Sequence, residues 1–248
     1  MLSSLRRLLA SSDLFAFNLR NRDKWIAGQA ACVPAGTRVL DVGAGSAPYR
    51  GLFAHCDYKT QDFSQLRDDQ LRYGGYAKLD FVSPADAIPV PDASFDVILC
   101  TEVLEHVPQP ISVLNEFARI LAQDGRLILT APLGSGVHQE PYHFYGGYTP
   151  YWYNKYLAEA GFDSINVAAN EGSLRHIAQE AIRFTAMTRP FGFAAPGYVH
   201  LLWSPFWLLF APVLALGVPA AAKLLDRFDT EQRFTVGYHV TAVRRRAA

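Results

Sequence analysis

The sequence is poor in the features that mark several specialised classes of protein. It contains only three cysteines, Cys32, Cys56 and Cys100, which are widely spaced and form neither a CxxC motif nor a cluster with histidines. This usage indicates a reducing compartment and predicts no metal site. The formal net charge is zero. A protein dedicated to nucleic acid usually carries a basic excess, so we expect no nucleic-acid partner.

A secretory signal is also missing at the N-terminus. Residues 1–17 include Arg6 and Arg7, but they lack a sustained apolar core and a clear small-residue cleavage site. The pattern predicts an amphipathic helix within a helical segment that covers residues 1–36. We expect the protein to be cytoplasmic.

What the sequence does contain is a short apolar strand that runs into a glycine-rich turn. Val39, Leu40 and Val42 predict a buried strand, and Gly43 and Gly45 follow it. Because glycine has no Cβ and tolerates positive φ, a ligand can approach the backbone closely at such a turn. Alone, the turn could serve a dinucleotide, a flavin or no ligand at all.

Strand and helix patterns alternate over residues 37–170, the predicted core. We expect strands at 37–42, 57–62, 77–81, 95–101, 126–131, 163–169 and 234–243. Helices are expected at 110–123, where apolar residues recur at helical spacing, and at 150–160, where Thr149 is the N-cap. The alternation predicts an α/β fold, with a mostly parallel, doubly wound sheet and helices on both faces.

Acidic residues recur where these strands end. They are Asp41, Asp62, Asp80, Glu102 and the pair Glu105-His106. Ligands of such sheets bind outside the carboxyl ends of the strands. The pattern therefore predicts a binding site with acidic groups along one edge of the sheet.

Two segments, LDVGAGSAPYR at 40–50 and FDVILCTEVLEHVPQP at 95–110, resemble motifs of the class I S-adenosylmethionine-dependent methyltransferases that act on small molecules. Ala47 stands where a third glycine is common, and alanine is nearly as small. The resemblance implies a Rossmann-like sheet of seven strands with an antiparallel last strand, and S-adenosylmethionine as the cofactor. Residues 138–162 resemble, more loosely, a subgroup associated with bacterial surface-glycan synthesis.

The resemblance implies cofactor-binding roles for residues at the strand ends. Asp41 would hold the ribose or the amino-acid part, and Gly43 and Gly45 would allow the methionyl part to come close. Asp62 would accept hydrogen bonds from both ribose hydroxyls. Each carboxylate has a plainer alternative, because Asp41 could cap the turn and Asp62 could begin a helix. Asp57 competes for the ribose if the strand register differs.

Three further residues complete the expected cofactor set. Asp80 would accept a hydrogen bond from the adenine amino group while Phe81 packs on the ring, although Phe81 could equally belong to the core. Glu102 follows the fourth strand and would face the cofactor or the methyl acceptor.

A base is needed if the acceptor is a hydroxyl group, and several residues are candidates. His143 is the first choice because it follows the fifth strand among aromatic residues that could form a platform for a sugar. His138 and Glu140 lie in the same segment, and His106 begins the short turn after the fourth strand. His143 could instead be a loop histidine, and His106 a structural residue at a helix start.

Residues 171–233 interrupt the pattern before the last strand and basic tail at 234–248. From 190 to 222 the chain contains no Asp, Glu, Lys or Arg. This length could span a bilayer, but three prolines would kink a spanning helix, and the flanking strands belong to one sheet. We therefore expect peripheral contact with the inner membrane surface. The alternative is a buried homodimer interface or a lid over the core.

Together these features favour an S-adenosylmethionine-dependent methyltransferase that O-methylates a glycan or lipid-linked acceptor at the membrane surface. A quinone-like or other small apolar acceptor is the alternative within the same class of reaction. A non-catalytic binding or assembly protein that retains the fold is the alternative outside it.

Overall fold

The computed structural model describes residues 14–246, which divide into two compact units. The larger unit contains Arg22–Ala168 and the chain from Gly237 onward. The smaller unit contains Ala169–Val236 together with the described part of Met1–Asn21. The smaller unit thus includes residues 171–233 together with a contribution from the N-terminal segment.

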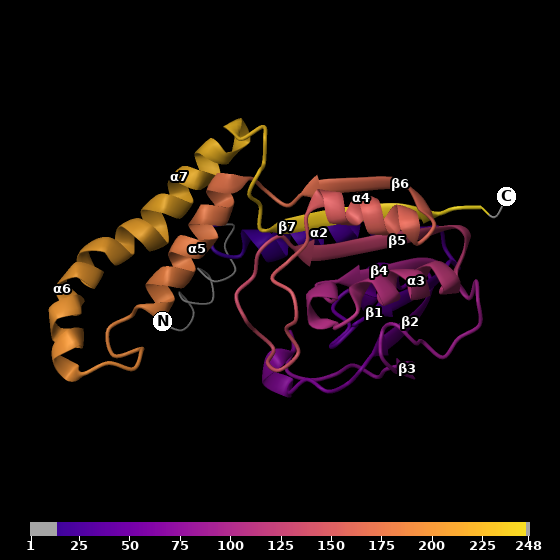
Figure 1. Ribbon diagram of the computed structural model, residues 1–248, viewed down its shortest axis with the longest axis horizontal. Coiled ribbons are helices and arrows are strands. Elements are labelled where there is room, and N and C mark those ends of the chain that lie inside the picture. Colours follow the sequence, from indigo (N-terminus) through magenta and orange to yellow (C-terminus); the bar gives the residue numbers. More distant parts are fainter. Residues whose placement is uncertain (1–13, 247–248) are drawn as a thin grey trace. The chain divides into compact units, whose positions relative to one another are not determined.

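A seven-stranded sheet in the order β3-β2-β1-β4-β5-β7-β6 forms the larger unit (Figure 1). Its strands are β1 (Arg38–Val42), β2 (Asp57–Asp62), β3 (Phe81–Val82), β4 (Phe95–Thr101), β5 (Leu121–Pro132), β6 (Phe162–Ala169) and β7 (Gly237–Arg244). Strand β1 pairs in parallel with β2 and β4, whereas β7 pairs antiparallel with β5. The expected mostly parallel sheet with an antiparallel last strand is confirmed.

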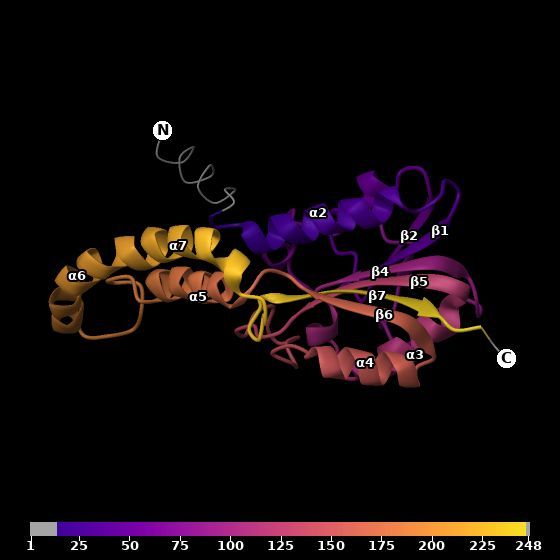
Figure 2. The same ribbon diagram turned by 90° about the horizontal axis from the view of Figure 1, so that it is seen from above.

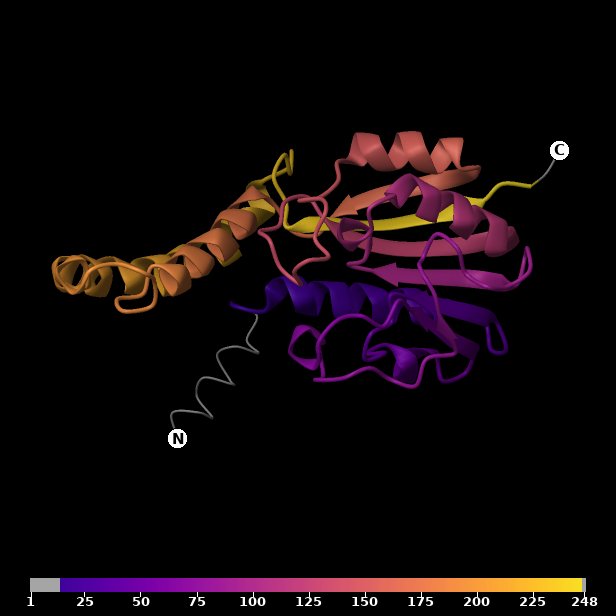
Figure 3. The ribbon, with the colours of Figure 1, turned by 60° about the horizontal axis from the view of Figure 1, so that its bottom comes forward.

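Helices cover both faces of this sheet, as the alternation predicts. Figure 2 shows α2 (Phe17–Ala31) over one face, and α3 (Pro110–Ile120) and α4 (Pro150–Glu159) over the other. The same separation of α2 from α4 is visible in Figure 3. Ile26 of α2 packs in one buried cluster with Val39 of β1. Strands that are covered on both faces consist of continuous apolar runs, which is why β1 and β4 are recognisable in the sequence.

Strand β3 differs from its predicted position. It contains only Phe81–Val82, so the prediction of a strand at 77–81 is wrong for its first four residues. The reason lies in Asp80, whose Oδ2 accepts hydrogen bonds from the backbone N–H of Thr60 at 2.9 Å and from its hydroxyl at 3.0 Å. A side chain thus occupies the donor on β2 that a paired strand would have used.

The border between α3 and β5 is also displaced. The helix ends at Ile120 and not at 123, and β5 begins at Leu121 instead of 126. The pairing register with β4 shifts at this point, and Asp124 has a left-handed φ of 60°. Asp124 and Gly125 predict a break in the chain, but the break is an irregularity within a strand and not a helix end.

Helix α4 begins and ends as its sequence predicts. The hydroxyl of Thr149 accepts a hydrogen bond from the N–H of Trp152 at 3.3 Å, and Pro150 occupies the first turn. Gly161 follows with a φ of 91°, and β6 begins at Phe162. At the N-terminus, α2 confirms a helix within 1–36, whereas most of the helix expected at 1–17 lies outside the described residues.

The smaller unit consists of helices that fold back on one another. Helix α5 (Ser173–Met187) packs against α7 (Val218–Leu225), which continues α6 (Gly197–Pro212) through a π-helical turn. Figures 1 and 2 both show α5 alongside α7. The carboxylate of Asp226 accepts N–H groups from Gly172 at 2.7 Å and from Arg175 at 3.0 Å. The chain therefore returns at Asp226 to the start of α5.

One helix in the described part of the chain, Gly197–Phe228, is long and apolar enough to cross a membrane by length and composition alone. Only 17% of its most apolar stretch is buried. The N–H groups of Trp203 and Trp207 donate to the backbone oxygens of Thr188 and Thr185 at the end of α5. The two indoles thus fasten α6 to α5, while most apolar side chains of α6 face outward.

Candidate active site

A cavity of about 420 Å³ opens at the carboxyl ends of β1, β2 and β4 in the larger unit. Residues at or directly after the ends of those strands line it, at 43–46, 61–63 and 101–103, together with loop residues at 84–86 and within 139–144. The volume is that of a small-molecule site. The strand ends that carry the predicted acidic residues therefore converge on one cavity.

Gly43 and Gly45 shape the cavity wall after β1, and both have left-handed φ values, of 68° and 53°. A Cβ atom on Gly43 would lie 2.3 Å from Cγ2 of Val103, and one on Gly45 would lie 3.2 Å from Cδ2 of Leu71. Position 43 therefore favours glycine for two reasons that do not involve a ligand. The backbone is left-handed there, and a larger residue would collide with Val103 after β4.

Asp41 lies under this turn with only 1% of its surface exposed, and it lines the cavity. Its carboxyl group accepts a hydrogen bond from the hydroxyl of Tyr58 on β2. Burial raises the pKa of Asp41 to about 7, although the bond to Tyr58 acts in the opposite direction. Asp41 thus links the carboxyl end of β1 to a side chain from the start of β2.

Asp62 fastens the glycine turn to the end of β2. One carboxylate oxygen accepts the N–H of Gly45 at 2.9 Å, and the other accepts the N–H of Ser64 at 2.9 Å. Burial raises the pKa of Asp62, while these backbone bonds lower it. Asp62 lines the cavity, so its carboxylate can act as an acceptor for ligand hydroxyl groups there.

Asp80 and Phe81 lie outside the cavity lining, which corrects their expected place beside the adenine. Phe81 is partly buried and makes an edge contact with Phe95, with ring centroids 6.5 Å apart. Asp86, which follows β3 by four residues, is the acidic residue of this loop that lines the cavity, next to Pro84 and Ala85. Had the sequence pattern predicted that β3 ends at Val82 and not at Phe81, Asp86 would have been the candidate acidic residue after this strand.

Glu102 lines the cavity after β4 and has two partners. Its Oε1 accepts the hydroxyl of Thr130 at 2.8 Å, and its Oε2 pairs with Nη1 of Arg22 at 3.0 Å. Burial lowers the pKa of Arg22, but the pairing with Glu102 raises it above its usual range. Glu102 is therefore an anchor for an arginine as well as part of the wall.

Arg22 of α2 lines the cavity, and no sequence motif points to it. Its Nε is buried and has no hydrogen-bond partner within residues 14–246. An unsatisfied buried donor of a guanidinium group costs free energy unless an acceptor fills the place. Arg22 is thus a candidate for holding an anionic group in the cavity.

His106 is the one predicted base that lines the cavity among the described residues. Its Nδ1 lies 2.5 Å from the backbone oxygen of Tyr142, so this nitrogen donates and Nε2 carries the lone pair. Burial lowers the pKa of His106 to about 4, and the neighbouring His138 and His143 add to the effect. The ring is therefore neutral at physiological pH.

His143, the first choice for the base, does not line the cavity, and neither does the further candidate Glu140. Nε2 of His143 lies 3.0 Å from the hydroxyl of Ser135, within the loop that follows β5. Glu140 is exposed, and its backbone oxygen accepts the side-chain amide of Gln70 at 3.2 Å. Neither side chain has the position that a proton acceptor in the cavity would need.

Comparison with known proteins identifies the region that contains the cavity. Residues 40–129 match the model of a family described as a methyltransferase domain. A ubiquinone biosynthesis O-methyltransferase of Xanthomonas axonopodis pv. citri (strain 306) is 32% identical over 104 residues, which cover 39% of this chain and 44% of that relative. This chain thus spans less than half of that protein.

A second relative extends the similarity along the chain. A protein of Mycobacterium leprae (strain Br4923) with the name of an uncharacterized methyltransferase is 29% identical over 205 residues, or 77% of this chain and 72% of the relative. Among solved structures, the 4+2 cyclase SpnF has a TM-score of 0.53 at 18% identity, covering 92% of this chain and 81% of that one. The last likeness concerns the fold alone.

Proposed function

We propose that this chain, an S-adenosylmethionine-dependent enzyme with a class I methyltransferase domain, O-methylates a lipid-linked acceptor at a membrane surface. A glycan on a lipid carrier is one such acceptor. The observation that carries the choice of acceptor is the outward-facing apolar surface of α6 and α7. Leu201, Leu202, Leu208 and Leu209 are each about two-thirds exposed or more. Apolar patches of this kind mark contacts with membranes or partners.

The residues of the cavity fit the cofactor. Asp62 offers two carboxylate oxygens to the ribose hydroxyls, and Asp86 offers an acceptor to the adenine amino group. Arg22 offers its unpartnered Nε to the carboxylate of the amino-acid part. The glycine turn at Gly43 and Gly45 leaves room beside them.

Bound S-adenosylmethionine supplies an electrophilic methyl group on a positively charged sulfur. Transfer of this group to an acceptor hydroxyl would leave S-adenosylhomocysteine as the neutral product, and the hydroxyl proton would pass to a base or to solvent. The protein's part is mainly alignment, which supplies about 7–11 kcal/mol in well-oriented systems. His106, Tyr142 and Phe144 are the cavity residues placed to hold the acceptor on the side of β4 and the loop after β5.

A quinone-like acceptor is the second candidate. It is supported by the relatives whose names give ubiquinone biosynthesis O-methyltransferase. Both acceptors are anchored in lipid, so the apolar unit fits either one, and the two differ in the group that receives the methyl.

Transfer of a labelled methyl group tests the proposal. The full chain is incubated with S-adenosylmethionine that carries tritium in the methyl group, together with lipid extracts, water-soluble sugar nucleotides or a short-chain hydroxylated quinone precursor. We expect label in the lipid extract, in a product that mild acid separates into a sugar and a lipid carrier. Label in the quinone arm alone selects the second candidate, and label only in water-soluble sugars contradicts a lipid-anchored acceptor. Heated protein is the control.

A further inference from the structure

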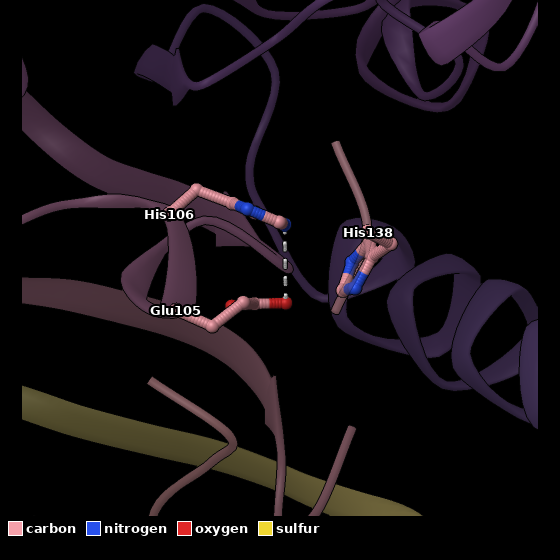
Figure 4. Close-up of side chains that lie close together, drawn as sticks. All are labelled: Glu105, His106 and His138. Atoms are coloured by element: carbon pink, nitrogen blue, oxygen red, sulfur yellow. Dashed lines mark ion pairs between the residues drawn. The ribbon is translucent and has the colours of Figure 1, made fainter. Parts of the chain in front are cut away.

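We propose that Glu105, His106 and His138 form a site for a divalent transition-metal ion at the edge of the cavity. One potential ligand atom from each residue lies within 4.8 Å of the others. Figure 4 shows the Glu105 carboxylate and the His106 ring pointing toward one another, with the His138 ring approaching from a separate segment of the chain. Glu105 and His106 are adjacent in the segment 95–110, and the loop after β5 brings the third member, His138, into place.

The hydrogen bonds of the two histidines leave one nitrogen of each ring free for a metal. Nδ1 of His106 donates to the backbone oxygen of Tyr142, and Nδ1 of His138 lies 2.9 Å from the backbone oxygen of Gly136. A carbonyl oxygen can only accept, so both Nε2 atoms carry lone pairs. Metal-binding histidines are held in this way, with the second nitrogen bonded to a carbonyl or carboxylate.

The contact between His106 and Glu105 supports an ion between them. Nε2 of His106 lies 3.7 Å from Oε1 of Glu105, which is too far for a hydrogen bond. Two ligands on one tetrahedral ion, with bonds of about 2.1 Å, lie about 3.4 Å apart. A cation in this gap would be attracted both to the lone pair of His106 and to the carboxylate oxygen of Glu105.

Glu105 adds an independent observation. Its side chain is 1% exposed, and its Oε2 has no hydrogen-bond partner among the residues that the structure describes. A buried carboxylate normally has its oxygens satisfied by donors or by a metal. An ion in the gap would bind Oε1, the oxygen nearest His106, and binding through both carboxylate oxygens would also give Oε2 its missing partner.

The ligand set indicates the kind of ion. Two imidazole nitrogens and one carboxylate suit zinc and neighbouring transition metals better than magnesium or calcium, which prefer oxygen. Three protein ligands leave a coordination position open, as in catalytic zinc sites. His143 is near enough to influence the site, since its ring centroid lies 4.7 Å from that of His138.

The open position gives the ion a role that rests on the proposed function. His106 lines the cavity, so an acceptor hydroxyl beside it can take the open position. A metal-bound hydroxyl loses its proton to solvent far more readily than a free one, which prepares the oxygen for methylation.

Metal binding by the full chain is the direct test. The protein is freed of metal with a chelator and titrated with Co²⁺, followed by visible absorption, and with Zn²⁺, followed by calorimetry. We expect one ion per chain, and a His138→Gln variant that binds about tenfold or more weakly. His138 is exposed, so this substitution leaves the core intact. A His55→Gln variant is the matched control, because His55 bonds to Val33 away from the cavity.

Failure to bind one ion, or equal affinity in the wild type and His138→Gln, would overturn the site. Binding of S-adenosylhomocysteine, measured in the same samples, shows that the variants are folded. These readouts require no methyl acceptor, so they decide the metal site even if the proposed reaction is wrong. If metal binds but its removal leaves methyl transfer unchanged, the role assigned to the ion is wrong.

Discussion

Two arginines, Arg22 and Arg72, line the cavity, and they differ in how many of their side-chain donors have a partner within the described residues. Both Nη atoms of Arg72 bond to the carboxylate of Asp23, at 3.0 and 2.6 Å. Arg22 pairs with Glu102 through Nη1, but its Nε is unsatisfied within the described chain. Arg72 therefore has a structural role in binding Asp23. Arg22 has an Nε–H group that can donate to an acceptor in the cavity.

Replacement of Arg22 by methionine tests this difference. We expect the variant to bind S-adenosylhomocysteine about tenfold or more weakly, because a charge-assisted hydrogen bond to the ligand carboxylate is lost. Affinity for 5′-methylthioadenosine, which lacks the amino-acid part, should hardly change. Calorimetric titration of both ligands measures the contrast, with Arg38→Met as a control outside the cavity. Equal losses for both ligands would show that Arg22 does not contact the carboxylate.

Asp41 predicts a pH dependence of stability. Its pKa is about 7 in the folded protein and near 3.9 when unfolded, so the folded state binds more protons between these values. The contribution of Asp41 is full below about pH 4 and is lost as the pH rises to 7.

Asp41→Asn keeps an oxygen for Tyr58 and removes the titration. The free energy of unfolding of the wild type should therefore fall relative to the variant by about 3 kcal/mol from pH 4 to 7. Urea unfolding at several pH values measures this difference, and a constant difference would mean that Asp41 titrates normally.

At the scale of elements, the turn after β1 is fixed by the end of β4 as much as by any ligand. A Cβ atom at Gly43 would collide with Val103, and the backbone there is left-handed. The glycine motif can be recognised in the sequence, but its partner cannot, since 60 residues of chain separate the two positions. Packing of one strand end on another is a tertiary property.

A double-mutant cycle separates the two reasons for glycine at position 43, which are the left-handed backbone and the contact with Val103. We expect Gly43→Ala to cost about 2–4 kcal/mol, partly from the left-handed backbone and partly from overpacking. With Val103→Ala in place, the same substitution should cost only about 1–2 kcal/mol, because the collision is removed and the backbone strain remains. Urea unfolding of the four proteins gives the coupling, and strict additivity would show that Val103 is not the obstacle.

The elements that the sequence predicts well are those with one dominant cause. Strands β1 and β4 are continuous apolar runs, and α4 has a capping threonine followed by proline. The position of β3 is predicted wrongly because the Asp80 side chain bonds to β2 where backbone pairing is expected. The pattern of apolar and polar residues gives no sign of such a bond. The loop after β5 is the least predictable part, so the order of the candidate bases changes once its fold is known.

The cofactor site is predicted in outline for the same reason. Asp41, Gly43, Gly45, Asp62 and Glu102 follow strand ends and do line the cavity. Arg22 comes from a helix on one face of the sheet, and its position depends on how that helix packs. Its distance along the chain from the strand ends leaves no local signal.

For the molecule as a whole, the smaller unit carries the exposed apolar surface on which the proposed membrane contact rests. Its helices carry apolar side chains that are exposed along α6 and α7, and Asp226 returns the chain to the start of α5. A segment that returns in this way cannot make a single crossing of a bilayer. It can lie in the headgroup region, with its exposed leucines in the acyl chains.

Flotation with liposomes tests this arrangement. We expect the wild type to float with vesicles that contain anionic lipid, and a Leu201→Glu/Leu209→Glu variant to remain in the soluble fraction. Both leucines are exposed, so the fold should tolerate the change. Tyr151→Glu on α4, also exposed, is the matched control. If the wild type does not float but sediments as a dimer that the leucine substitutions dissociate, the surface is a subunit interface.

The position of β7 in the sheet has a consequence for how the protein is made. Strand β7 lies between β5 and β6, yet it follows the apolar helices in the chain. During translation β6 therefore leaves the ribosome before its pairing partner β7. It stays unpaired until the helices and then Gly237–Arg244 have been synthesised. An unpaired strand and an exposed apolar segment coexist in this interval, which is the situation in which nascent chains aggregate. Early capture of the helices by a membrane or a chaperone would protect the unfinished sheet.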